Sequence, residues 1–242
     1  MLNYLLNLTF DGQYFCGTQY QKDQLTLVGI LKNKLDQIYK KDVKVICCSR
    51  LDSKVSAKSY YINFIEEEIF TAAYLTYLLN RYFPSYIHLN FIKIVPLDFN
   101  SRKLAKYKTY LYNINIGEAN PLKDRFAFKP IFNIDCALFI KTIKAFEGKH
   151  DFSSFYSIDD KTLPLKEVKK VTVIKKGNYL QVKIKGHAFG RYQIRYMIGA
   201  AIQVSLNKMN YNDIIDRLNG NKMEYKNYKA PAEGLILYKV EY

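Results

Sequence analysis

The chain has 242 residues, of which 49% are hydrophobic and 15% aromatic, and its 37 Lys and Arg outnumber its 22 Asp and Glu to give a net charge of +15. The high hydrophobic content indicates one or two globular domains rather than a disordered chain. A chain of this size buries about 70 to 75% of the surface of its unfolded form, so its core needs no disulfide or metal ion for stability. Its four Cys lack C-x-x-C spacing, its three His are scattered, and no apolar run reaches the roughly 18 residues of a membrane span, so we expect a cytoplasmic protein with no metal and no membrane segment.

The first hundred residues predict the order strand, helix, strand, strand, helix, strand. The first strand, Leu2–Phe10, is followed by the turn-like pair Asp11-Gly12 and a loop rich in Gln and aromatic residues. A helix is expected over 26–41, because its apolar residues recur at steps of three and four. A buried run at 43–48 then leads into a loop over 49–57. The remaining elements are a strand over 59–65, a helix over 66–83 and a strand over 86–95.

Residues after 100 predict a second α+β series. It consists of a strand over 106–116, a helix over 135–147, hairpin strands over 167–175 and 179–185, a helix over 189–206, a short helix capped by Asn212 and ended by Gly220, and a last strand over 234–242. No flexible linker is visible between the two series. We therefore expect an α+β fold in two similar halves, 1–100 and 101–242, with the functional site in the crevice between them.

The positive charge is concentrated in the second half of the chain. Residues 1–100 carry an excess of only two basic residues, whereas residues 101–242 carry an excess of 13. Between Lys161 and Arg195 ten basic residues accompany one acid, Glu167, and aromatic residues are interleaved among them. Basic and aromatic residues together favour a nucleic acid partner, although lysine-rich surfaces also serve solubility alone.

Arg195 is the most unusual charged residue, because it lies in a predicted helix that is apolar on most sides. A buried guanidinium requires a carboxylate, and none occurs between Glu167 and Asp213. Asp52 is a candidate partner, since it follows a buried run and lies beside a second cation, Arg50, and such a carboxylate stays ionised. The alternative is that Arg195 reaches the surface and Asp52 only caps a turn.

Two further patterns contain residue types that could carry chemistry. In the predicted strand over 106–116, Lys108, Tyr110 and Tyr112 share one face, which suits base stacking but also ordinary packing in a sheet. His150 and Asp151 resemble an acid–base pair, yet neighbours on a strand point to opposite faces. The absence of a Walker loop and of G-x-S-x-G disfavours nucleotide hydrolysis and serine esterase activity.

Two segments of the N-terminal half, FDGQYFCGTQYQ and SRLDSKVSA, resemble motifs of the bacterial tRNA pseudouridine synthase A family, TruA. The loop FDGQYFCGTQYQ is similar to the family's YDG-x-x-F-x-GWQ-x-Q and includes Gln19, with Thr18 in place of the tryptophan. The segment SRLDSKVSA is similar to GRTD-x-GVHA. It keeps Arg50 and Asp52 but replaces both glycines, one of them by Lys54.

Two more motifs follow residue 100. The segment SRKLAKYKTYLY is similar to the family's A-R followed by R-x-Y-x-Y, and it contains Arg102, Lys103, Lys108 and Tyr110, with Lys in place of Arg at 108. The segment GKHDFSSF is similar to G-x-HDF-x-x-F. Both occur in the family's order along the chain.

The last two motifs complete a resemblance that covers the whole chain. The segment AFGRYQIRYMIG is similar to AFLHHMVRN-x-VG and keeps Arg195, with Arg191 and Tyr192 in place of two His. The segment APAEGL, which ends at Leu235, is unchanged. Six motifs in the right order make the resemblance specific.

The resemblance implies a fold and a reaction. It implies two α+β halves whose antiparallel sheets join into one extended sheet, with the catalytic cleft between them. It implies a homodimer that binds one tRNA and converts uridines at positions 38 to 40 of the anticodon arm to pseudouridine, with no cofactor and no metal. The target base would be flipped out of the RNA.

The resemblance also implies roles for individual residues. Asp52 would be the nucleophile that attacks the ribose or the uracil ring, and Arg195 would pair with it and keep it ionised. Tyr110 would stack on the flipped uracil and help remove the proton from its carbon 5. Arg50 would assist flipping of the base.

Five more residues would bind the substrate by the same resemblance. Arg102, Lys103 and Lys108 would contact phosphates, which fixes the position of the tRNA without reading its sequence. Gln19 and Leu235 would contact the substrate from their own motifs. Two alternatives stay open, because the motif around Asp52 has changed: a tRNA-binding protein of the same fold without catalysis, and a synthase directed to another RNA site.

Overall fold

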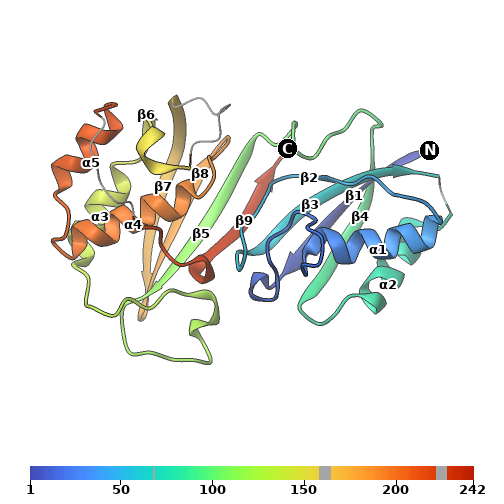
Figure 1. Cartoon of the computed structure of the whole chain (residues 1–242), viewed down its shortest axis with the longest axis horizontal. Coiled ribbons are helices and arrows are strands. Elements are labelled where there is room, and N and C mark those ends of the chain that lie inside the picture. The colour runs from blue at the N-terminus through green and yellow to red at the C-terminus, as the bar shows by residue number, and fades with distance from the viewer. Residues whose placement is uncertain (68, 158–164, 222–227) are drawn as a thin grey trace. The chain divides into compact units, whose positions relative to one another are not determined.

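The structure, a computed structural model, describes residues 1–67, 69–157, 165–221 and 228–242. Glu68, in a predicted helix, and Lys161, at the start of the basic stretch, lie outside these ranges. The described residues form two compact units, one of residues 1–106 with 236–242 and the other of residues 107–235. Each unit has its own strands and its own helices (Figure 1).

The first unit is a sheet with two helices packed on it. Its strands lie in the order β4-β1-β3-β9, and β2 also pairs with β3. The pairings of β1 with β3 and β4 are antiparallel, whereas β9 joins β3 in parallel. The elements are β1 (Leu2–Phe10), α1 (Leu27–Tyr39), β2 (Ile46–Cys47), β3 (Ser56–Glu66), α2 (Ala72–Tyr82), β4 (Ile87–Val95) and β9 (Leu235–Glu241).

Two helix starts in the first unit follow from side-chain caps. The Thr26 side chain accepts a hydrogen bond from the Gly29 N–H at 3.1 Å and begins α1 as predicted. The helix predicted over 66–83 begins later, at Ala72, because the Thr71 side chain caps it. Glu66 instead extends β3, where it pairs with Leu2 of β1.

The second unit is an antiparallel sheet with helices α3 and α4 packed side by side (Figure 1). Its strand order is β5-β8-β7-β6. Alternate residues of β8 are fully buried, and they form the core with apolar residues of the helices. The elements are β5 (Tyr107–Asn115), α3 (Cys136–Lys144), β6 (Gly148–Asp151), β7 (Leu165–Lys176), β8 (Tyr179–Gly186), α4 (Gln193–Ser205) and α5 (Tyr211–Leu218).

Three features of the second unit differ from the predicted order of elements. Residues 148–151 form the short strand β6, which pairs with β7 and which that order does not include. Helix α4 begins at Gln193 rather than at 189, because Tyr192 adopts a left-handed conformation with φ of 63°. Helix α5 is capped by Asn210 rather than Asn212, and Asp213 completes the capping box.

The end of the chain returns to the first unit. The predicted halves divided the chain at residue 100 and assigned everything after it to the second half. The pairing of β9 with β3 instead places residues 236–242 with the first unit. Both units are α+β, as predicted, and the joining of the two sheets into one stays a prediction.

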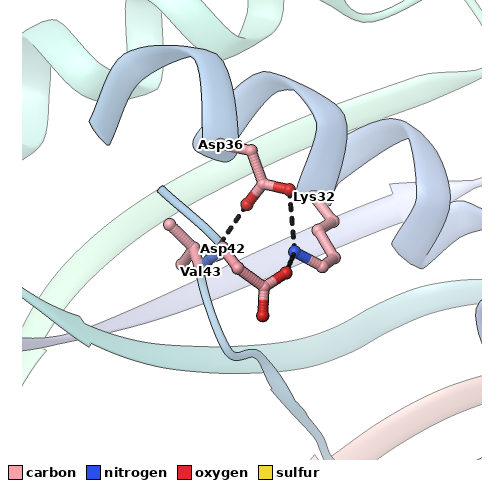
Figure 2. Close-up of polar contacts among 4 residues, drawn as sticks. All are labelled: Lys32, Asp36, Asp42 and Val43. Carbon is pink, nitrogen blue, oxygen red and sulfur yellow. Dashed lines mark hydrogen bonds and ion pairs between the residues drawn. The ribbon is translucent and has the colours of Figure 1, made fainter. Parts of the chain in front are cut away.

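A polar cluster fixes the exit from α1 (Figure 2). The Asp36 carboxylate accepts hydrogen bonds from Lys32 Nζ and from the Val43 N–H, both at 2.7 Å, and Lys32 also contacts Asp42. Lys32 therefore ties α1 to the segment that leads into β2. That segment continues into the loop that carries Asp52.

Candidate active site

Asp52 lies in the loop between β2 and β3, and the loop is held on both sides of it. Before it, the Leu51 N–H donates to Thr18 Oγ1 at 2.9 Å, and the Thr18 N–H donates to the Leu51 carbonyl at 3.2 Å. After it, Ser53 Oγ and the Lys54 N–H both donate to the Phe15 carbonyl, at 3.1 and 3.2 Å. The motif FDGQYFCGTQYQ thus holds the motif SRLDSKVSA in place.

The loop around Asp52 closes in a tight turn. The Val55 N–H donates to the Asp52 carbonyl at 3.2 Å, and Lys54 occupies the third position of this turn with φ of 66°. Turns with positive φ at that position favour glycine, and Lys54 stands where the family motif has glycine. The turn after Asp52 therefore holds a lysine in a backbone conformation that favours glycine, which strains it.

Close packing of two backbone segments explains why position 12 of the first motif is a glycine. Gly12 approaches the Asp52 loop so closely that a Cβ there would lie 2.1 Å from the Val55 carbonyl oxygen. Its N–H donates to Ser56 Oγ at 2.9 Å. Only glycine allows this approach, which supports the start of β3 directly after the loop.

The other predicted residues of the first unit lie at its surface. Arg50 and Gln19 are exposed, as are Arg102 and Lys103. The backbone N–H groups of Arg102 and Lys103 both donate to the Asn100 side chain at 3.0 Å. These exposed cations belong to the same unit as Asp52.

The turn with Arg102 is joined to the strand that precedes the Asp52 loop. Ser101 Oγ donates to the Ile46 carbonyl of β2 at 2.9 Å. Burial raises the pKa of the Cys47 thiol to about 11, although the nearby charge of Arg102 lowers it. Arg102 therefore lies near β2, one short segment before Asp52.

In the second unit, Tyr110 points to the buried face of its sheet. Its residue opposite in β8 is Ile184, and Lys108 and Tyr112 share its face, as the sequence predicts. Tyr110 is only 7% exposed, and its ring meets the Phe189 ring edge to face, with centroids 5.4 Å apart. Tyr110 is thus packed against an aromatic residue of the helix motif.

Arg195 is half-buried in the first turn of α4 and is bound to the segment 228–231. Its Nε donates to the Ala230 carbonyl at 2.7 Å, and the Ala230 N–H donates to the Arg195 carbonyl at 3.1 Å. Gly199, one turn later, packs so closely that a Cβ would lie 1.8 Å from the Tyr228 carbonyl oxygen. The helix motif and the APAEGL motif therefore form one structural element.

Tyr112 connects β5 to the same segment. Its hydroxyl donates to the Pro231 carbonyl at 2.8 Å. Burial raises the pKa of Tyr112 well above its ordinary value, although the Arg195 charge lowers it, so the hydroxyl stays a proton donor. Three motifs, around Tyr112, Arg195 and Ala230, are thereby joined within the second unit.

The structure divides the predicted site residues between the two units. Asp52, Arg50, Gln19, Arg102 and Lys103 belong to the first unit, and the remaining ones, Lys108, Tyr110, Arg195 and Leu235, belong to the second. Leu235 is buried at the first position of β9. The pairing of Asp52 with Arg195 stays a prediction.

Sequence reasoning missed the residues that hold the site together. Phe15 and Ala230 act through backbone carbonyls, and such a contact leaves no signature in residue type. In the sequence Thr18 is a departure from the family's tryptophan, yet its hydroxyl binds the loop before Asp52. Its position next to Gly17 within the first motif is the signal that the sequence offers for this role.

The GKHDFSSF motif has a structural role in the second unit. His150 Nε2 lies 3.0 Å from the Glu147 carbonyl, and the Asp151 carboxylate accepts from the Ser153 N–H at 2.7 Å. Phe152 and Phe155 are fully buried. His150 and Asp151 each have their own partner, in agreement with the expectation that they do not act as a pair.

Across residues 1–67, 69–157, 165–221 and 228–242, no helix combines the length and apolar character that crossing a bilayer requires. Within the same ranges, no three His, Cys, Asp or Glu side chains are grouped closely enough to hold a metal ion.

Relatives match nearly the whole chain, and a family model matches its C-terminal part. A family model described as tRNA pseudouridine synthase matches residues 142–242. The tRNA pseudouridine synthase A of Mycoplasmoides gallisepticum is 34% identical over 99% of this chain and 91% of its own length, and that of Aquifex aeolicus is 32% identical over 99% of both. That of Oenococcus oeni is 29% identical over 100% of this chain and 98% of its own length.

Similarity to solved structures is weaker. In a crystal structure of a Cbf5-Nop10-Gar1 complex, one chain is 14% identical, with a TM-score of 0.38 over 81% of this chain and 46% of that chain. A similarity of that size carries no weight beside relatives that match from end to end. On the identity and coverage of those relatives, the chain belongs to the tRNA pseudouridine synthase A family.

Proposed function

We propose that this chain converts uridine to pseudouridine at positions 38 to 40 of the tRNA anticodon arm, with Asp52 as the nucleophile. The observation that carries the proposal is the fixation of the Asp52 loop by Thr18 and Phe15 on either side of the carboxylate. Catalytic groups must be held to within about half an ångström of their working position, and a loop fixed at both ends meets that need.

The reaction is an isomerisation, so it requires no oxidant and no co-substrate. The bond between ribose C1′ and uracil N1 breaks, the base turns, and a bond forms between C1′ and C5. The proton on C5 leaves and N1 gains one. Asp52 attacks either C1′ or the uracil ring, and an ionised carboxylate suits both routes.

Arg195 is proposed to keep Asp52 ionised and oriented. Its support is the hydrogen bond from Arg195 Nε to the Ala230 carbonyl, which holds the guanidinium at the start of α4, while the Ala230 N–H binds the Arg195 backbone carbonyl. A fixed cation beside a carboxylate lowers the carboxylate pKa and holds its direction. Tyr110, packed edge to face on Phe189, is proposed to stack on the uracil and to assist removal of the C5 proton.

The tRNA would be held mainly through its phosphates. Arg102 and Lys103 are exposed cations in the same unit as Asp52, and Lys108 shares the face of Tyr110. Such contacts set the register of the RNA without reading its sequence. Arg50 would support the flipped base, and Gln19 and Leu235 would complete the substrate contacts.

A homodimer that binds one tRNA is part of the same proposal, as is action in the cytoplasm.

The positions at which pseudouridine forms in the tRNA test the proposed function. Unmodified tRNA transcripts treated with the protein are labelled with a carbodiimide specific for pseudouridine and read by primer extension. We expect stops that report positions 38 to 40, whereas stops elsewhere would show a synthase directed to another site.

A further inference from the structure

An aromatic stack with an exposed outer ring lies at the carboxyl end of β1. The rings of Tyr14 and Tyr86 are nearly parallel, at 14°, with centroids 4.2 Å apart. The Phe15 ring meets the Tyr86 ring edge to face at 5.6 Å and is itself buried. Tyr14, the outermost residue of the stack, is 48% exposed. Because Tyr86 covers one face of the Tyr14 ring, solvent reaches the ring from the opposite face and the edge.

The backbone that carries both rings is fixed by hydrogen bonds. Tyr14 closes the 3₁₀ turn Gly12–Tyr14, which begins where the Asp11 carboxylate accepts the Gln13 N–H at 3.0 Å. Tyr86 directly precedes β4, and its carbonyl accepts the Asp11 N–H at 2.9 Å. The Tyr14 ring therefore has a firm support, and binding a flat ligand on it costs little conformational entropy.

The stack lies at the same end of the sheet as the Asp52 loop. Phe10, at the end of β1, pairs with residues near the starts of both β3 and β4. The Asp52 loop leads into β3 and Tyr86 leads into β4, so they lie on either side of β1, about 10 Å apart by the spacing of strands. The Phe15 carbonyl, one residue after Tyr14, binds the Asp52 loop directly.

An aromatic ring in this place suits a nucleobase of the tRNA. The proposed reaction takes the target uridine out of the base stack, which uncovers a face of the neighbouring base. Proteins bind unpaired RNA bases by stacking them on aromatic side chains. A ring fixed near the Asp52 loop would replace the stacking that the neighbouring base loses. The net charge of +15 favours RNA over an apolar protein partner for this surface.

We propose that the Tyr14 ring, supported by Tyr86, stacks on the loop base that directly precedes the target uridine in the tRNA strand. The proposal rests on the proposed function, because the nucleotide that reacts at Asp52 is its reference point. It concerns a base, whereas Arg102 and Lys103 are proposed to contact phosphates. Stacking tolerates every base, so Tyr14 would hold the strand without reading its sequence.

The family resemblance assigns no role to either ring. Position 14 is one of the unspecified positions of the motif YDG-x-x-F-x-GWQ-x-Q, and Tyr86 lies outside the six motifs. The two residues are far apart in the chain, and only the pairing of β1 with β4 brings them together. The stack is therefore a property of this chain that its structure reveals.

Affinity for an unmodified tRNA transcript tests the stack. Tyr14→Leu keeps an apolar side chain and removes the ring, and we expect it to weaken binding about tenfold, within the range of one base–aromatic stack. Tyr14→Phe keeps the ring and should bind like the wild type. Tyr74→Leu is the matched control, because Tyr74 is 47% exposed and stacks on Tyr77 in α2, at the end of that helix farther from Tyr86. It should leave the affinity unchanged.

A photochemical cross-link identifies the base. A tRNA with its target uridine at position 39 carries 5-iodocytidine at position 38, and irradiation couples the iodinated ring to an aromatic side chain stacked on it. We expect the cross-link at residue 14 in the wild type and in Tyr14→Phe, and its loss in Tyr14→Leu. Unfolding curves confirm that each variant is folded.

Three results would overturn the stack. They are equal affinities of Tyr14→Leu and the wild type, equal losses for Tyr14→Leu and Tyr74→Leu, and a cross-link from position 38 to another segment. A lower mass in solution for Tyr14→Leu with unchanged tRNA affinity would assign the ring to a contact between copies of the chain, and would also overturn it.

Release of tritium from C5-labelled uridine at saturating tRNA reports the reaction separately. If the wild type releases tritium but forms no cross-link at Tyr14, the stack fails and the proposed function stands. If the wild type forms the cross-link but releases no tritium, the reaction fails and the stack stands.

Discussion

Thr18 and Leu51 exchange two hydrogen bonds between segments that are 33 residues apart in the chain. The Thr18 hydroxyl accepts the Leu51 N–H, and the Leu51 carbonyl accepts the Thr18 N–H. Both residues are buried. Since Asp52 follows Leu51 directly, this exchange fixes the backbone from which the proposed nucleophile projects.

Replacing Thr18 by Val tests that relationship, because Val keeps the shape and removes the acceptor. The buried Leu51 N–H would lose its partner, which we expect to cost about 1 to 2 kcal/mol in the free energy of unfolding. Turnover should fall as the Asp52 loop loosens. Thr18→Ser keeps the hydroxyl and should retain most of the stability and most of the turnover. Denaturant unfolding and single-turnover assays measure the two effects, and equal behaviour of Val and Ser would contradict the role of the hydroxyl.

Lys54 strains the turn that follows Asp52, and Lys54→Gly should relieve it. Glycine adopts positive φ without steric cost but loses more entropy on folding, so we expect a net gain of up to about 1 kcal/mol. Turnover should stay equal or rise, because the turn keeps its geometry. Lys54→Ala removes the side chain and leaves the strain, so it should give no gain in stability. Thermal unfolding compares the three proteins, and a loss of stability in Lys54→Gly would show that the strain is negligible.

Gly199→Ala should separate α4 from the segment that holds Arg195. The added methyl would meet the Tyr228 carbonyl, so the two backbones must move apart, at a cost of about 1 to 3 kcal/mol. Because the Ala230 carbonyl would then lose its alignment with Arg195 Nε, we expect turnover to fall more than tRNA binding. Stability, affinity and turnover of the variant are measured together. Normal turnover in Gly199→Ala would contradict the positioning of Arg195 by Ala230.

The cluster around Lys32 predicts a pH dependence of stability. The hydrogen bond and charge of Lys32 lower the pKa of Asp42 below its ordinary value of 3.8. A carboxyl with a lowered pKa in the folded state stabilises the protein above its unfolded pKa, and the contribution disappears as the pH falls through the folded pKa. The difference in stability between wild type and Asp42→Asn should be constant near neutral pH, begin to shrink near the unfolded pKa of about 4, and disappear only below the lowered pKa of the folded state. Unfolding curves from neutral pH down to about pH 2 measure it, and a constant difference throughout would refute the coupling.

Residue patterns predicted most elements of both units, because apolar periodicity and turn residues act locally. They missed features that depend on partners far away in the chain. Strand β6 exists because β7 pairs with it, and residues 236–242 join the first unit because β9 pairs with β3. The late start of α2 at Ala72 follows from the cap by Thr71 and from the pairing of Glu66 in β3.

In the candidate site, too, the sequence identifies some features and leaves others to the structure. The residue types of Asp52, Tyr110 and Arg195 identify candidate chemistry, since each carries a reactive or charged group. Their supports are backbone carbonyls, such as that of Ala230, and a carbonyl is present in every residue. Sequence therefore indicates which groups act, whereas only the structure shows what fixes them.

The central claim is that Asp52 is the nucleophile of a uridine isomerisation. Its most direct test is tritium release from C5-labelled uridine in an unmodified tRNA transcript, measured for the wild type and for Asp52→Asn at saturating tRNA. We predict release by the wild type, none by Asp52→Asn, and nearly equal tRNA affinity for the two proteins. Tight tRNA binding by the wild type without any release, or equal release by both proteins, would contradict the assignment of Asp52.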